Sequence, residues 1–243
     1  MQKTYCEELL LRTCHCDMGG AWRPSSVLEA MQESAGMHSH LLGCGRDQLI
    51  ERGIVWVLSR CQVRMDAYPR IGERVRILTY PTAVRHWFFP RHFTFTGENG
   101  RPLGAAATLW ALFDLESRRM APPGEVAQCL PDNADLRPIL PAPGAIERCA
   151  GEAERFERAC VFSELDVNGH LNNTRYADWL CDALGLATMR ANCLCDWRIN
   201  YAAEVLPGQE VSLRLTREGQ KCYLCGEHAG KAHFEISARL APR

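Results

Sequence analysis

One internal duplication constrains the fold of this 243-residue chain more than any other feature. Residues 16–22 (CDMGGAW) resemble residues 165–171 (LDVNGHL), and residues 68–75 (YPRIGERV) resemble residues 204–211 (EVLPGQEV). The matched residues are Asp17 with Asp166, Gly20 with Gly169, Gly36 with Gly185, and Gly72 with Gly208. Because a repeated sequence unit is a repeated supersecondary structure, we expect two similar halves. The first pair of segments lies 149 residues apart and the second 136, so the second half lacks 13 residues between its helix and the following strand.

Hydrophobic periodicity predicts the same elements in each half: a short strand, a helix and a meander of antiparallel strands. The expected strands are 5–13, 54–65, 74–80, 87–96 and 103–114, then 155–162, 193–203, 210–216, 221–227 and 232–240. An apolar stripe at helical spacing predicts the second helix, with members Tyr176, Trp179, Leu180, Ala183, Leu184 and Ala187. These patterns indicate an α+β fold in which a sheet wraps around a helix. We expect an N-terminal half over residues 1–116, a linker rich in Pro, Ala and charge over 117–151, and a C-terminal half over 152–243.

Composition narrows the classes of function. The formal net charge is −1, so no overall field favours nucleic acid. Residues 1–13 lack the basic start and long apolar run of a signal peptide, and no apolar run is long enough to span a bilayer, so we expect a cytoplasmic protein. The thirteen cysteines are then expected to be reduced thiols. Cys222 and Cys225 form a lone C-x-x-C, followed by His228 and His233, but no second ligand pair matches it, so we expect no metal or other cofactor.

A comparison of the two halves separates what the fold needs from what a site needs. Asn168 stands where the first half has Gly19, and His170 stands where it has Ala21. Glu204 stands where the first half has Tyr68. Polar residues that only one half retains are candidates for chemistry, so we expect the active site in the second half.

The segment 166–173 supports this expectation. Asn172 or Asn173 suits the N-cap of the following helix, whose free N–H groups would stabilise an oxyanion. In an extended strand, Asp166, Asn168 and His170 would share one face. Glu204 would serve as a general base if burial raised its pKa towards neutrality. Plainer interpretations stay open: Asp166 and Asn168 as turn residues, His170 as a core histidine and Glu204 as a solvated charge.

The pattern Asp166-x-Asn168-x-His170-x-x-Asn173-x-x-Tyr176 resembles the acyl-ACP thioesterases of plants and bacteria. Further resemblance lies in 56–60, 68–73, Arg91, Trp110 and 116–119. The resemblance implies a tandem (double) hotdog fold, each half being a long helix wrapped by an antiparallel sheet. It carries the catalytic roles onto Asp166, Asn168, His170 and Glu204. It also implies an acyl-chain pocket in the first half, near Met31, Ala35, Trp56 and Trp110. A cysteine that follows the glutamate in plant members is Val205 here, which disfavours a cysteine nucleophile.

The activity implied by the resemblance is hydrolysis of fatty acyl–acyl carrier protein (ACP) thioesters, which releases free fatty acid and holo-ACP in fatty acid biosynthesis. Glu204 with Asp166 would activate a water, Asn168 and His170 would orient the reactants, and direct attack by Asp166 stays open. The acidic carrier protein would dock on basic residues, for which the candidates are Arg85, His86, Arg91 and His92, or Arg118 and Arg119. The alternatives are an acyl-CoA thioesterase, a hotdog dehydratase or hydratase, and a non-catalytic acyl-binding hotdog module. Acyl chain length stays open, as does the choice between monomer and homodimer.

Overall fold

The computed structural model describes residues 2–243, which divide into two compact units. The first unit ends at Pro143 and the second begins at Gly144. The division therefore falls within the segment 117–151 that composition indicates as a linker. Among the described residues, no helix combines the length and apolar character needed to cross a membrane.

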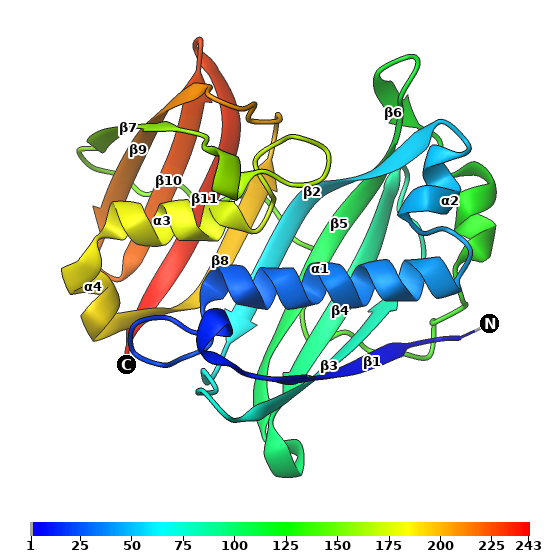
Figure 1. Ribbon diagram of the computed structural model, residues 1–243, viewed down its shortest axis with the longest axis horizontal. Helices are drawn as coiled ribbons and strands as arrows, with labels where there is room; N and C mark the ends of the chain where they lie inside the picture. Colours follow the sequence, from blue (N-terminus) through cyan, green and yellow to red (C-terminus); the bar gives the residue numbers. More distant parts are fainter. Residues whose placement is uncertain (1) are drawn as a thin grey trace. The chain divides into compact units, whose positions relative to one another are not determined.

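The first unit is an antiparallel sheet with one long helix across it (Figure 1). Its strands are β1 (Tyr5–Leu10), β2 (Ile54–Met65), β3 (Arg74–Pro81), β4 (Phe88–Thr96), β5 (Pro102–Asp114) and β6 (Arg119–Ala121). Its helices are α1 (Pro24–Leu41) and α2 (Arg46–Ile50), with 3-10 turns η1 (Thr13–His15), η2 (Glu98–Gly100) and η3 (Gly124–Cys129). The strand order is β1-β3-β4-β5-β2, and the short β6 pairs with the end of β5.

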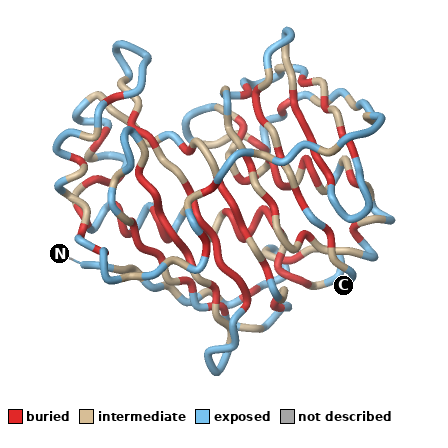
Figure 2. The backbone as a smooth tube through the Cα atoms, turned by 180° about the vertical axis from the view of Figure 1, so that it is seen from behind, coloured by how far each residue is buried: buried red, intermediate tan, exposed pale blue. Residues whose placement is uncertain are grey.

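Helix α1 forms because its sequence offers the sheet one apolar face. Pro24 occupies the first turn, where a missing N–H costs nothing. Val27, Met31 and Ala35 recur every four residues and are all buried. Buried and exposed positions alternate in the first half of β3, whereas β4 and β5 have runs of consecutive buried residues. Long buried stretches of the strands are seen in red from behind (Figure 2).

The second unit repeats this design with a shorter helix. Its strands are β7 (Glu154–Ala159), β8 (Asn192–Tyr201), β9 (Glu210–Glu218), β10 (Lys221–His228) and β11 (Lys231–Pro242). A 3-10 turn η4 (Phe162–Glu164) precedes α3 (Arg175–Leu184) and α4 (Leu186–Ala191). The strand order is β8-β11-β10-β9-β7, all antiparallel, with α3 lying across the sheet (Figure 1).

The apolar stripe of α3 is confirmed up to Leu184 and wrong at Ala187. Tyr176, Trp179 and Leu180 are buried, whereas Ala187 is exposed. The helix ends at Gly185, whose φ of 81° is a conformation that suits glycine and breaks helical geometry. Residues after Gly185 therefore start a new helix with a different face.

The two units share backbone hydrogen bonds at matching positions, which confirms the duplication. The Gly72 N–H donates to the Leu11 carbonyl and the Gly208 N–H donates to the Cys160 carbonyl, both at 2.9 Å. The missing 13 residues come from the helical segment, since α1 begins 30 residues before β2 and α3 begins 17 residues before β8. Gly36 lies inside α1 whereas Gly185 ends α3, so this matched pair has no common role.

Much of the segment 117–143 packs on the first unit. Beyond β6, Val126 in η3 is buried with Leu112 and Ala121. The Asn133 side-chain amide donates to the carbonyls of Lys3 and Pro81, at 3.0 and 2.8 Å. These contacts tie the segment to the first sheet.

Candidate active site

The segment that carries Asp166, Asn168 and His170 is a tight turn. One Asp166 carboxylate oxygen, Oδ1, accepts the N–H groups of Asn168 at 2.8 Å and His170 at 3.2 Å. The Asp166 carbonyl accepts the Gly169 N–H at 3.0 Å, and Gly169 has a φ of 77°. The expectation that three alternating residues share a strand face is therefore wrong. A turn gathers them, because an aspartate side chain bonds readily to the backbone just ahead of it.

The first unit contains the same turn without the polar side chains. The Asp17 Oδ1 accepts the N–H groups of Gly19 at 2.8 Å and Ala21 at 3.2 Å. Shaping the turn is thus a function of the aspartate in both halves. What the second half adds is the Asn168 side-chain amide, which donates to Asp166 Oδ2 at 3.2 Å. Asp166 therefore orients Asn168 as well as the backbone.

His170 and Glu204 face each other across the second unit's site. His170 Nε2 lies 3.5 Å from Glu204 Oε2. The side chain of His170 is 31% exposed and that of Glu204 is 52% exposed. The burial on which the general-base interpretation of Glu204 depended is absent from this unit. The structure thus brings together the imidazole and the carboxylate, in a setting open to water.

Glu204 follows a corner in the chain after β8, which is bonded to His233 near the start of β11. The N–H groups of Ala202 and Ala203 donate to the His233 carbonyl at 2.8 and 3.0 Å. The His233 Nδ1 lies 2.7 Å from the Glu204 carbonyl. A carbonyl only accepts, so Nδ1 carries the hydrogen. Burial lowers the pKa of His233, against the opposing effect of its bond to Glu204, so the ring is neutral at neutral pH.

The N-terminus of α3 is not capped as predicted. Thr174 is the N-cap residue, and the Asn172 Oδ1 accepts both the N–H and the hydroxyl of Thr174 at 3.0 Å. The Arg175 N–H donates to the Asn172 carbonyl at 2.9 Å. The prediction of Asn172 or Asn173 as N-cap is wrong, because the turn continues past both. Two N–H groups expected to hold an oxyanion are therefore already bonded within the chain.

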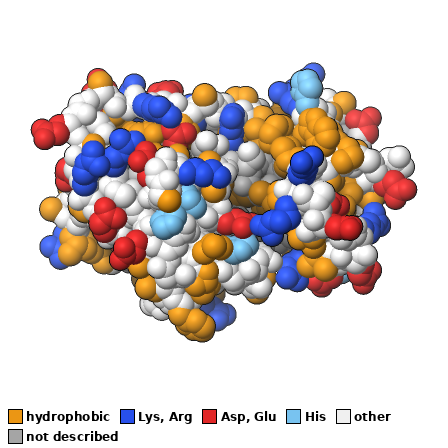
Figure 3. Space-filling view, turned by 90° about the horizontal axis from the view of Figure 1, so that it is seen from above, with side chains coloured by type: hydrophobic (Ala, Val, Ile, Leu, Met, Phe, Trp, Pro, Cys, Tyr) orange, Lys and Arg blue, Asp and Glu red, His pale blue; other side chains and the backbone are white. Residues whose placement is uncertain are grey.

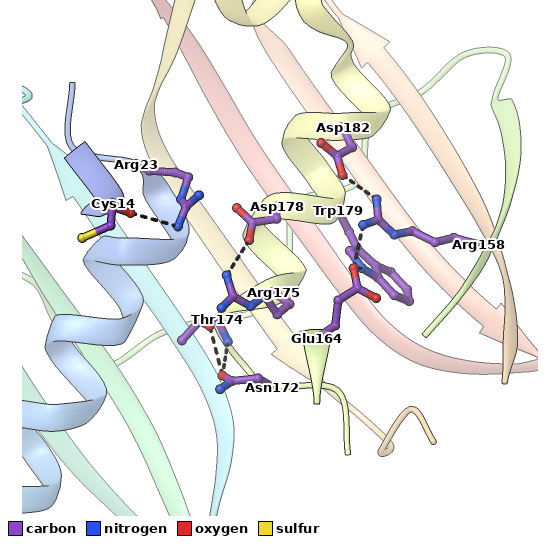
Figure 4. Close-up of polar contacts among 10 residues, drawn as sticks. All are labelled: Cys14, Arg23, Arg158, Glu164, Asn172, Thr174, Arg175, Asp178, Trp179 and Asp182. Carbon is purple, nitrogen blue, oxygen red and sulfur yellow. Dashed lines mark hydrogen bonds and ion pairs between the residues drawn. The ribbon is translucent and has the colours of Figure 1, made fainter. Parts of the chain in front are cut away.

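A partly buried charge network fixes the turn to α3 (Figure 4). Arg158 bonds Glu164 and Asp182, each at 2.6 Å, and its guanidinium lies 4.9 Å from the Trp179 ring centroid. The Trp179 Nε1–H donates to the same Glu164 oxygen at 2.8 Å. The Asn172 N–H donates to the Glu164 carbonyl. This network joins η4, the turn and α3 into one frame.

An aromatic cluster underlies the site. Tyr176 makes edge-to-face contacts with Tyr201 and Phe234, at 5.1 and 4.8 Å between ring centroids. Burial raises the pKa of Tyr176, and the charges of Glu204 and Asp166 raise it further, so the phenol stays protonated. The Tyr201 hydroxyl donates to the Asn173 carbonyl at 2.9 Å. The sequence comparison missed Tyr201, whose only signal is its place at the end of β8.

Two further sequence features can be placed. Among residues 2–243, no group of three or more His, Cys, Asp and Glu side chains is arranged to hold a metal ion, and all thirteen cysteines are free thiols. Arg91 and His92 are buried, so they do not belong to an exposed basic cluster. The Arg91 guanidinium instead bonds His38, Ser39 and Thr79 under α1.

Two helix-on-sheet units, with a polar cluster at the turn and corner of the second, define a double-hotdog protein with one candidate active site. A family model described as the acyl-ACP thioesterase N-terminal domain matches residues 2–127, and one described as the C-terminal domain matches residues 150–238. The chain belongs to the acyl-ACP thioesterase family.

Solved structures confirm the fold class. The crystal structure of an acyl-ACP thioesterase from Bacteroides thetaiotaomicron matches with a TM-score of 0.89, at 21% identity over 98% of each chain. A 12:0-ACP thioesterase from Umbellularia californica matches with a TM-score of 0.82, at 18% identity over 99% of this chain and 98% of that one.

Curated relatives match over a smaller part of their own length. A chloroplastic palmitoyl-acyl carrier protein thioesterase of Cuphea hookeriana is 26% identical over 202 residues, which are 76% of this chain and 48% of the relative. Its Arabidopsis thaliana namesake is 27% identical over 201 residues, 76% of this chain and 49% of the relative. The chain thus spans about half the length of the curated relatives that it matches.

Proposed function

We propose that this chain hydrolyses fatty acyl–ACP thioesters to free fatty acid and holo-ACP, as a step of fatty acid biosynthesis in the cytoplasm. The observation that carries the proposal is the contact between His170 and Glu204, 3.5 Å apart beside Asn168, in only one of two duplicated units. Family membership supports the substrate class. Thirteen free thiols suit the reducing cytoplasm.

In this mechanism Glu204 is the general base without the burial expected from the sequence, because its exposed carboxylate is accessible to the attacking water. Its exposed carboxylate takes a proton from water as the water oxygen attacks the thioester carbonyl carbon. The C–S bond then breaks, and the proton passes from Glu204 to the departing sulfur. His170, in contact with the Glu204 carboxylate, holds it in place and hydrogen-bonds the water. No metal or organic cofactor takes part in this scheme.

Asn168 supplies the oxyanion donor. An amide nitrogen carries two hydrogens, and the contact with Asp166 uses one of them. The other is free to donate to the carbonyl oxygen as it gains charge. Asp166 is a positioning residue in this scheme, not the nucleophile. Its carboxylate already accepts three hydrogen bonds within the turn, which leave it poorly placed for attack.

We assign different tasks to the expected domains. The catalytic half is the one expected over residues 152–243, and the half expected over 1–116 holds the acyl chain. Buried Met31 and Ala35 on α1 support an apolar lining there. Trp56 and Trp110 pack beside Phe89 and Leu112 at the end of the same sheet.

The carrier protein would meet a surface of mixed charge. On the face shown in Figure 3, basic and acidic side chains are interspersed. With Arg91 and His92 buried, four basic docking candidates remain, and all are exposed: Arg85, His86, Arg118 and Arg119. The assembly we propose is a monomer or a homodimer, without nucleic acid.

The test is turnover by the purified chain on matched acyl-ACP and acyl-CoA series of increasing chain length. We expect hydrolysis selective for acyl-ACP, with kcat lowered at least about 100-fold by His170→Ala and by Glu204→Ala. His40→Ala is the control, since His40 is an exposed histidine on α1 of the first unit.

Each other outcome contradicts a specific part of the proposal. Equal or faster turnover of acyl-CoA would move the protein to the acyl-CoA thioesterases. Binding of acyl-ACP without turnover would make it an acyl-binding module. Turnover that is indifferent to both substitutions would refute the site.

A further inference from the structure

The corner that carries Glu204 exists in both units, but the residue whose carbonyl accepts its two N–H groups differs. In the first unit, the N–H groups of Asp66 and Ala67 donate to the Leu103 carbonyl at 2.8 and 3.1 Å. In the second, Ala202 and Ala203 donate to the His233 carbonyl in the same way. Leu103 and His233 are thus equivalent positions, and the backbone alone suffices to form the corner.

What His233 adds is a bond to the residue that the proposed chemistry depends on. Its Nδ1–H donates to the Glu204 carbonyl at 2.7 Å, a bond that the leucine side chain cannot make to Tyr68, the equivalent of Glu204. His233 is 7% exposed, so water competes little for this bond. The half that keeps Glu204 has the histidine, and the half that has lost it has leucine.

The contact of Glu204 with His170 shows what the bond from His233 would control. The Glu204 side chain is 52% exposed, and its carboxylate contacts His170 at 3.5 Å. The corner lies between β8 and β9, outside the regular ladder. A carboxylate on such a segment keeps its place only if its backbone is fixed.

We propose that His233 is a positioning residue, which fixes the backbone of Glu204 so that its carboxylate meets His170 in reactive geometry. This inference rests on the proposed hydrolysis. It assigns His233 a role in the reaction itself, through Glu204, in addition to its place in the core.

The test measures kcat and KM of the full chain on its best acyl-ACP substrate. His233→Leu installs the first unit's residue and removes the donor. We expect kcat to fall about 10- to 100-fold with KM nearly unchanged, because small misplacements of a catalytic group have effects of that size. His233→Asn returns a donor near the Nδ1 position and is expected to restore most of kcat. His40→Leu, at an exposed position of α1 in the first unit, is the control and is expected to leave kcat unchanged.

A double variant separates positioning from mere stability. In a Glu204→Gln background, His233→Leu is expected to change the residual kcat very little, since no carboxylate remains to be positioned. An equal fall in both backgrounds, or no recovery with His233→Asn, would overturn the inference. Should His233→Leu not fold, His233→Phe keeps a ring and removes the donor. A wild-type chain without hydrolysis would refute the proposed function, whereas wild-type turnover that survives His233→Leu would refute this inference alone.

Discussion

Asp17 and Asp166 make the same two backbone contacts, yet the residues two and four positions ahead are polar only after Asp166. Each carboxylate accepts an N–H two residues ahead at 2.8 Å and another four residues ahead at 3.2 Å. An aspartate at this position is therefore explained by the turn alone. The catalytic contribution of Asp166 has to be sought in its additional bond to Asn168.

This pair of residues allows a matched test. Asp17→Ala and Asp166→Ala are each expected to lower the free energy of unfolding by about 1–2 kcal/mol, because each leaves two N–H groups without their charged acceptor. Only Asp166→Ala is expected to lower kcat on acyl-ACP. Chemical denaturation measures the first effect and steady-state turnover the second. A fall in kcat with Asp17→Ala as large as with Asp166→Ala would contradict the assignment.

At the scale of elements, α3 owes its position to charge as well as to its apolar stripe. Glu164 in η4 is 8% exposed and bonds both Arg158 from β7 and Trp179 from α3. Burial raises the pKa of Glu164, but the bonds from Trp179 and Arg158 outweigh burial, so the pKa lies below its ordinary value. The ionised carboxylate thus links three elements.

We expect Glu164→Gln to lower the free energy of unfolding by about 2 kcal/mol at pH 7. The loss is smaller than for a fully buried pair because Arg158 keeps Asp182. A group whose pKa is lowered on folding stabilises above its unfolded pKa, so the difference between wild type and variant should shrink as the pH falls below about 4.5. Denaturant titrations at several pH values test this. Glu154→Gln, at a pair whose glutamate is 57% exposed, is the control and should change little.

The sequence predicted the strands well and the short elements poorly. Alternation over many residues predicted 54–65, which is β2 as observed. The five-residue α2 and three-residue β6 are too short to produce a periodic signal. The comparison of halves named Asn168, His170 and Glu204, of which the last two lie 3.5 Å apart. It misjudged their geometry, because residues two apart share a face in a strand and also meet in an aspartate turn. The exposure of Glu204 depends on tertiary packing that no local pattern records.

At the scale of the whole molecule, ionisable groups buried in the first unit make the protein sensitive to acid. Burial and the charge of Arg91, 3.0 Å away, together lower the pKa of His38 to about 4, against the opposing effect of its bond to the Gln2 carbonyl. Burial also lowers the pKa of His92 to about 4. Both histidines are therefore neutral in the folded state at neutral pH.

The sign of the effect follows from proton binding. Between about pH 6.5 and pH 4 the unfolded chain binds protons at His38 and His92 that the folded chain does not, so stability is lost as the pH falls. The double variant His38→Gln/His92→Gln removes both groups. Its melting temperature is expected to fall less than that of the wild type between pH 7 and pH 5. Parallel slopes for the two proteins would contradict this account.

The reactivity of the cysteine thiols towards an alkylating reagent should follow their exposure to solvent in both units. Burial raises the pKa of Cys61 and of Cys222 to about 12, and that of Cys44 to about 11. Cys6 and Cys14 are exposed. Since only thiolates react, iodoacetamide at pH 8 should label Cys6 and Cys14 in the native protein and spare the three buried thiols. Mass spectrometry of the labelled chain checks the pattern, and labelling of Cys61 before unfolding would contradict it.

The first unit keeps the backbone framework of the candidate site without its polar side chains. Its backbone forms the turn at Asp17 and the corner at Asp66 and Ala67 with the same hydrogen bonds as in the second unit. Gly19, Ala21, Tyr68 and Leu103 occupy the places of Asn168, His170, Glu204 and His233. Placing the second unit's four side chains at these positions would therefore need no new turn or corner in the first unit. The first unit is thus a starting framework for engineering a second active site into the same chain.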